Sequence, residues 1–145
     1  MSGFFVAGIP VPQGSKKGFS ARGSSFVQIV DDNKAKLQPW REAIAKVAAA
    51  TWEYGKPLEG PVRVEAIFVL PRGKTVRREW PHVKPDSDKL LRALLDGITD
   101  AKCVWGDDAQ VVQLVAEKVY GAAPGVHVVI SPVGESRAPV ESAAA

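Results

Sequence analysis

Residues 84–92, Lys84-Pro85-Asp86-Ser87-Asp88-Lys89-Leu90-Leu91-Arg92, open the stretch that decides the fold of this chain. From residue 90, leucine and isoleucine recur at three- and four-residue spacing as far as Ile98, which predicts a helix over residues 86–98 with one buried face. Asp88, Arg92 and Asp96 repeat every four residues on the other side of that helix. Since proline holds the residue before it extended, Pro85 fits the start of the helix.

Carboxylates gather at both ends of this helix. Asp86 and Asp88 flank a serine at its entrance, and Asp107-Asp108 follow its exit. Capping of free N–H groups accounts for one aspartate at a helix N-terminus, but not for this larger set. Like charges so close need a cation or several donors to neutralise them. Because carboxylate oxygens suit Mg²⁺ or Mn²⁺, which also take waters and phosphate oxygens, the sequence predicts a divalent-metal site.

The composition is that of one ordinary globular domain with an uneven charge distribution. The 145 residues are 46% hydrophobic and carry a net charge of +3, which allows a buried core and is only mildly basic. Cations gather in two segments, and beside the acids they predict a polyanionic partner, although each segment taken alone is better explained as a solvated loop. The residues expected to contact that partner are Lys16, Lys17, Arg72, Lys74, Arg77, Arg78 and Lys84.

Several classes of protein are excluded or disfavoured. The single cysteine, Cys103, rules out an internal disulfide and a CxxC metal site, and it fits a reducing cytoplasm. His82 and His127 form no ligand pattern. We expect no signal peptide, since the first residues lack a basic region leading into a long apolar run, and no apolar run is long enough to cross a membrane.

The rest of the chain predicts a mixed α/β domain. Short apolar runs predict strands. For residues 110–120, the density of β-branched residues favours a strand over a helix. A second helix is expected over 33–53 after capping residues at 31–33, and Pro39 leaves open whether 33–38 form a separate turn. The basic loop over 71–85 is expected to be functional. The domain should span 1–131, and the tail 132–145 should be disordered. The strands are expected over 3–9, 25–30, 61–70, 110–120 and 126–131.

At this point the sequence resembles the RusA family of Holliday junction resolvases. The segment from Pro85 to Gly97 matches the family's P-D-x-D-N-x-x-K pattern and the apolar helix with a further aspartate. Residues 104–112, Val-Trp-Gly-Asp-Asp-Ala-Gln-Val-Val, match its D-D-x-Q-V block, and Lys118 matches a lysine in the following strand. Gly8-Ile9-Pro10-Val11-Pro12 looks like the family's opening strand, so the resemblance covers about residues 4 to 131.

The resemblance implies a small α/β (α+β mixed) homodimer with about four to five strands packed against two main helices. It implies Mg²⁺- or Mn²⁺-dependent cleavage of four-way DNA junctions in recombination and repair, by a cytoplasmic bacterial or phage protein. Carried over by position, Asp86, Asp88 and Asp108 are the metal-binding catalytic acids, with Asp107 as a further ligand, and Arg92 takes a catalytic position. Lys89 and Lys118 join the residues expected to bind DNA.

Two positions depart from the family pattern. Lys89 replaces an asparagine, and Arg92 replaces the catalytic lysine. Arginine keeps the charge and binds phosphate bidentately, but it is a poor proton donor. Arg92 is equally well placed to pair with Asp88 or Asp96 at rest. We expect Arg92→Lys to retain or raise cleavage and Arg92→Ala to lower it greatly.

Three functions therefore remain open from the sequence. The first is a structure-selective endonuclease. The second is a protein that grips branched DNA without cutting it, which the substituted Lys89 and Arg92 keep open. The third is a phosphohydrolase acting on nucleotides, which the basic loops and the lack of a Gly-rich phosphate-binding motif disfavour.

Overall fold

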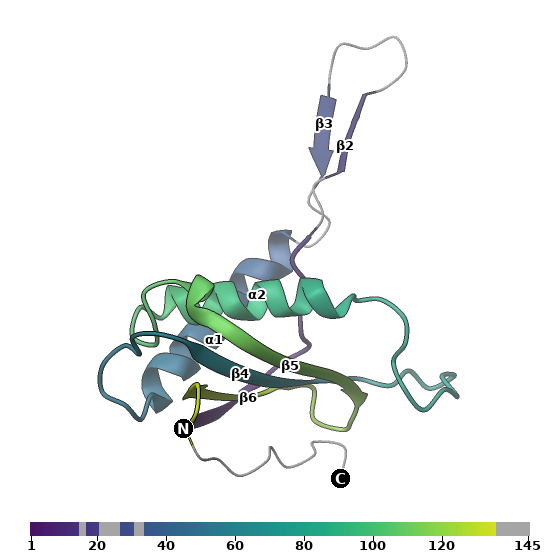
Figure 1. The fold of residues 1–145 in the computed structure, drawn as a ribbon. Coiled ribbons are helices and arrows are strands. Elements are labelled where there is room, and N and C mark those ends of the chain that lie inside the picture. Colours follow the sequence, from purple (N-terminus) through teal and green to yellow (C-terminus); the bar gives the residue numbers. More distant parts are fainter. Residues whose placement is uncertain (15–16, 21–26, 31–33, 136–145) are drawn as a thin grey trace.

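The computed structural model describes residues 1–14, 17–20, 27–30 and 34–135 as a four-stranded mixed sheet with two helices on one face (Figure 1). The strand order is β1-β6-β4-β5. β4 and β5 run parallel, and the other two pairs are antiparallel. This architecture confirms the predicted fold class. The strands are β1 (Ser2–Ala7), β4 (Val62–Leu70), β5 (Val111–Tyr120) and β6 (Gly125–Pro132).

A separate two-stranded antiparallel sheet stands apart from the main sheet (Figure 1). It consists of β2 (Lys17–Ser20) and β3 (Val27–Val30). The strand predicted over 25–30 is present as β3, whereas β2 was not among the predicted strands and begins at Lys17, one of the residues expected to contact DNA. Lys16 and the predicted capping residues 31–33 lie outside the described residues.

The apolar run in β4 is explained by burial on both faces of the sheet. Val64 and Phe68 belong to the main core beneath the helices. Ile67 and Val69 alternate with them and form a second small cluster with Val119. β4 therefore lies at the centre of the domain, as its sequence predicted.

The helices α1 (Lys34–Thr51) and α2 (Ser87–Asp100) share that main core. Pro39 lies inside α1, so the alternative of a separate turn before it was wrong. Leu37 and Trp40 on either side of the proline are buried, and tertiary packing of this kind stabilises a helix that local propensity would interrupt. Neither described helix has the length and apolarity needed to cross a membrane.

Gly97 is buried inside α2, which continues to Asp100, two residues past the predicted end of the helix at residue 98. A Cβ atom at Gly97 would lie 2.9 Å from Cβ of Ile44, so the missing side chain lets α1 and α2 approach closely.

The end of the described chain is held against the domain. β6 continues through Pro132, and the N–H of Val133 donates to the carbonyl of Pro61 at 3.0 Å. Tyr54 Oη donates to Glu135 Oε2 at 2.6 Å. Residues 132–135 therefore pack against the domain, past its predicted end at residue 131. The rest of the predicted tail, 136–145, lies outside the described residues.

Candidate active site

The entrance of α2 leaves its first aspartate available to a ligand. Asp86 is the N-cap residue, with extended backbone, but its side chain makes no capping hydrogen bond to the described residues. Its Oδ2 instead lies 3.8 Å from Nζ of Lys89, an exposed pair of small energetic value. Capping therefore does not account for Asp86, and Lys89 partly neutralises that carboxylate.

Lys118 of β5 ties down the chain just before Asp86. Its Nζ donates to the carbonyl oxygens of Val83 and Pro85, both at 2.8 Å. Lys118 lies on the same strand face as Ala116, which packs on the core. A lysine on the core side of a strand needs hydrogen-bond acceptors inside the protein. The position of Lys118 in the strand pattern was therefore the signal in the sequence that it has a structural role as well as the predicted role in DNA binding.

The turn after α2 separates the roles of its two aspartates. Asp107 caps the short 3₁₀ helix η1 (Asp108–Gln110), and its Oδ1 accepts from the N–H of Ala109 at 2.9 Å. The N–H of Asp107 donates to Oε1 of Gln110 at 3.2 Å, which completes a reciprocal capping arrangement. Capping therefore accounts for Asp107, whereas the side chain of Asp108 has no capping role in this turn.

Gln110 fixes this turn to the rest of the domain, a role that sequence reasoning missed. Its Nε2 donates to the carbonyls of Leu58 and Gly60, at 2.9 and 3.0 Å, in the segment that leads into β4. The spacing Asp-x-x-Gln is a capping signature and was the available signal.

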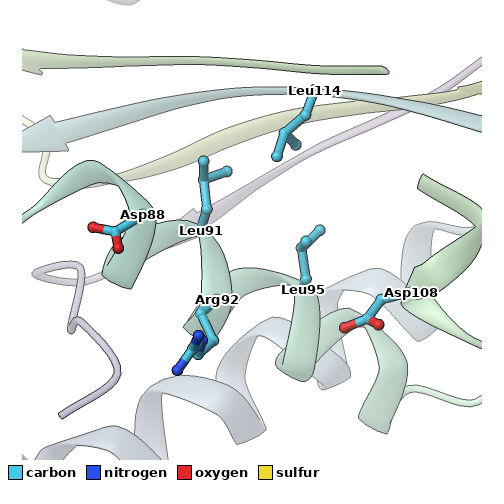
Figure 2. A pocket seen from close by; sticks show the side chains of 6 residues that line it. All are labelled: Asp88, Leu91, Arg92, Leu95, Asp108 and Leu114. Atoms are coloured by element: carbon cyan, nitrogen blue, oxygen red, sulfur yellow. The ribbon is translucent and has the colours of Figure 1, made fainter. Parts of the chain in front are cut away.

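The predicted acids of α2 and η1 meet at one hollow, which we call the acidic cavity (Figure 2). It has a volume of about 320 Å³. Figure 2 shows Leu91 and Leu95 of α2 pointing toward Leu114 of β5, with the two carboxylates at opposite sides. Its lining residues are Asp88, Leu91, Arg92, Leu95, Asp108 and Leu114.

The surroundings of Asp108 disfavour the charged form of its carboxyl group. Burial raises the pKa of Asp108, and a hydrogen bond with Asp107 and the charges of Asp107 and Asp96 raise it further. Asp96, expected to pair with Arg92, thus contributes instead to the negative potential at Asp108. Within the described part of the chain, Arg92 forms no ion pair with Asp88 or Asp96, so its guanidinium is free to bind an anion.

The donor set fits a hard divalent cation, although it is not assembled around one point. No group of three His, Cys, Asp or Glu side chains among the described residues is close enough to hold an ion. Mg²⁺, however, takes one or two carboxylates and completes its shell with waters and phosphate oxygens. Asp86 and Asp88 at the entrance of α2, and Asp108 after its exit, supply carboxylates of this kind.

The basic loop packs its arginines on the end of β5. The guanidinium carbons of Arg72 and Arg78 lie 4.9 and 5.9 Å from the ring centre of Tyr120. Arg72 also donates to the carbonyl of Glu79 at 3.2 Å. The other predicted cations of the loop are exposed, and of Lys17 the structure describes only the backbone. These exposed residues are Lys74, Arg77 and Lys84.

Comparison with known proteins decides the family. The sequence matches the family described as Endodeoxyribonuclease RusA over residues 8–131. This chain belongs to the RusA family. The matched range contains both acidic segments, the basic loop and Lys118, so the resemblance seen in the sequence is confirmed, and RusA membership implies an endodeoxyribonuclease of the Holliday junction resolvase type.

The RusA match is accompanied by a relative whose role is not described. The uncharacterized protein YqaN of Bacillus subtilis (strain 168) is 29% identical to this RusA chain over 145 residues. The similarity covers 90% of this chain and 95% of YqaN.

Proposed function

We propose that this protein is a Mg²⁺- or Mn²⁺-dependent endodeoxyribonuclease that resolves four-way DNA junctions by paired phosphodiester hydrolysis. The observation that carries the proposal is the meeting of Asp88, Arg92 and Asp108 at the acidic cavity, although they come from separate parts of the chain. Carboxylates beside a guanidinium that forms no ion pair among the described residues suit a phosphodiester and a divalent cation together.

The residues of the acidic cavity have different roles in the proposed hydrolysis. Asp88 and Asp108, together with Asp86, would hold the ion, and Asp107 caps the turn that carries Asp108. The chemistry that Mg²⁺ or Mn²⁺ would supply there, when bound, is activation of water and neutralisation of charge on the phosphodiester. Arg92 holds the phosphate through bidentate hydrogen bonds, and its guanidinium acts as an electrostatic group rather than as a proton donor.

One experiment tests this function against its alternatives. The protein is incubated with a synthetic four-way junction, a linear duplex or nucleotides, in Mg²⁺, Mn²⁺ or EDTA. Paired nicks near the branch that disappear in EDTA are expected. A shifted but intact junction would replace the proposal with a binding protein, and hydrolysis of nucleotides alone would replace it with a phosphohydrolase.

A non-cleaving DNA-binding protein is the second candidate. Two observations favour it: Lys89 lies against Asp86, and the described acids are not gathered around one point. Such a protein would keep its affinity for junctions in EDTA and would show no nicks at any metal concentration.

We further propose a homodimer formed through the edge of β5. β5 ends the sheet order, and in its described surroundings it pairs only with β4. Val112, Leu114 and Val115 of this strand are 62%, 43% and 46% exposed. A long apolar edge strand invites pairing with another chain, and a two-fold symmetric dimer suits a junction in which two strands are cut in a related way.

Val112→Lys is expected to convert the dimer to a monomer, since it places a charge in the apolar edge. Cleavage should be lost with it, because Leu114 of the same edge lines the acidic cavity. Light scattering after gel filtration measures the mass. Ala49→Lys, an exposed position on α1, is the matched control and should remain dimeric. A Val112→Lys dimer would exclude this edge as the interface.

Lys118→Met is expected to lower Mn²⁺ affinity and cleavage about 10- to 100-fold, the usual loss when a group that orients ligands is removed. It deletes both hydrogen bonds to the chain before Asp86. Calorimetric Mn²⁺ titration without DNA provides the measurement. Lys84→Met removes the same charge from an exposed neighbour and should leave the titration unchanged. Equal Mn²⁺ affinities in the two variants would show that Lys118 does not position the acids.

A further inference from the structure

A second hollow lies between the basic loop and the ends of β4 and β5, and we call it the proline-lined cavity. Its volume is about 250 Å³. Four prolines, with Leu70, Val76 and Val83 among its other apolar residues, form most of its wall. Its polar groups come from Arg78, Lys84 and Tyr120. A flat, mostly apolar ligand therefore fits it better than a phosphate group, which would lose its hydration against such walls.

Arg78 brings to the cavity a buried hydrogen-bond donor that has no partner among the described residues. Its Nε is buried and has no partner among the residues that the structure describes. Its guanidinium carbon lies 5.9 Å from the ring centre of Tyr120, which also lines the cavity. Buried donors are nearly always paired in native proteins, so an unpaired one calls for an acceptor from outside the chain.

The proline-lined cavity and the acidic site are neighbours along the chain. Lys84 and Pro85 line the cavity, and Asp86 follows directly. Lys118 fixes both the Val83 and the Pro85 carbonyls, so the wall of the cavity and the entrance of α2 are held by the same side chain. A DNA strand with a phosphate at the acids would pass this cavity within a few nucleotides.

We propose that the proline-lined cavity binds one unpaired nucleobase of the DNA strand near the cut. The inference rests on the proposed junction nuclease function. The apolar walls accept the faces of a base, and Arg78 donates to acceptors on the base edge. Arg72 and Lys84 at its margin contact the adjoining phosphates. A base at a branch is already partly unstacked, so placing it here costs less than extruding it from duplex DNA.

The test couples a change in the protein to a change in the DNA. Four-way junctions carry one abasic site, moved in single steps across three nucleotides on each side of the branch. Their affinities are measured in EDTA by fluorescence anisotropy. For wild-type protein, one position should cost about tenfold in affinity, the scale of losing one stacked base. Arg78→Met keeps the aliphatic stem but removes the donors, and this abasic penalty should shrink at least threefold.

A neighbouring arginine provides the control. Arg77→Met removes the same charge from an exposed position outside the cavity, and it should weaken all junctions equally while keeping the abasic penalty. Val76→Phe fills the cavity without a change of charge and should also abolish the penalty. Equal penalties in wild type, Arg78→Met and Val76→Phe, or no penalty at any position, would overturn the subsite.

Failure of the subsite is distinguishable from failure of the nuclease. If the abasic penalty at one position depends on Arg78 in EDTA but no nicks appear in Mg²⁺ or Mn²⁺, the subsite proposal stands and the nuclease proposal is refuted. Paired nicks without coupling would retain the nuclease and refute the subsite.

Discussion

Asp88→Asn and Asp108→Asn are each expected to lower junction cleavage by about a thousandfold while junction affinity in EDTA changes little. Asparagine keeps the shape of the side chain but removes the charge that neutralises a divalent cation, and loss of one such electrostatic group typically costs this much. Initial rates on a synthetic junction in Mg²⁺ and Mn²⁺ provide the measurement. Both residues line the acidic cavity, so both losses are expected.

Asp107→Asn is the matched control, one residue away. Asparagine caps a helix as well as aspartate does, and the hydrogen bond that Asp107 accepts from Ala109 would persist. Cleavage by this variant should remain within about tenfold of wild type, since it keeps the turn that positions Asp108. If Asp107→Asn is inactive and Asp108→Asn is active, the roles assigned to the two aspartates must be reversed.

The stability of the Asp108→Asn variant gives an independent readout. The pKa of Asp108 is raised in the folded protein by burial and by Asp107 and Asp96. A group with a raised folded pKa stabilises the protein below its unfolded pKa, and this contribution is lost as pH rises through the folded pKa. Near neutral pH, metal-free Asp108→Asn should therefore melt above wild type. Mn²⁺ should raise the melting temperature of wild type more than that of the variant.

Local periodicity was enough to predict the main elements of this fold. The spacing of Leu90, Leu94 and Ile98 predicts α2 because a helix brings these positions to one face, and all three are buried. The apolar run of β4 likewise predicts a central strand. Local patterns did not predict the role of Gly97, because its cause is Ile44, which lies more than fifty positions earlier and meets it only through the packing of two helices.

The candidate site was predictable in its residue types but not in its division of roles. Asp107 and Asp108 are chemically alike in the sequence, and only the turn makes one a cap and the other a cavity residue. In the sequence, Lys118 cannot be distinguished from the other cations. Its structural role becomes clear only from the two backbone carbonyls to which it donates. Side chains that bind backbone atoms distant in the chain leave little trace in local sequence, and here they hold the site in place.

Arg92→Ala is expected to lower cleavage by about a hundredfold, whereas Arg92→Lys should stay within about tenfold of wild type or exceed it. Arg92 lines the acidic cavity and forms no ion pair with Asp88 or Asp96 among the described residues, so its charge is available to the phosphate. Lysine keeps that charge, and alanine removes it. Single-turnover rates at saturating protein separate this effect from a loss of affinity.

Arg77→Ala controls for a general loss of positive charge, because Arg77 is exposed on the basic loop and lies outside the acidic cavity. It should weaken binding and leave the single-turnover rate unchanged. The pH dependence then identifies what Arg92 does. If the side chain at position 92 acts only by its positive charge, the Arg92→Lys variant and the wild-type protein will have the same pH–rate profile. A new dependence at alkaline pH in the lysine variant alone would indicate proton transfer by that lysine. An alanine variant that cuts at the wild-type rate would remove Arg92 from the mechanism.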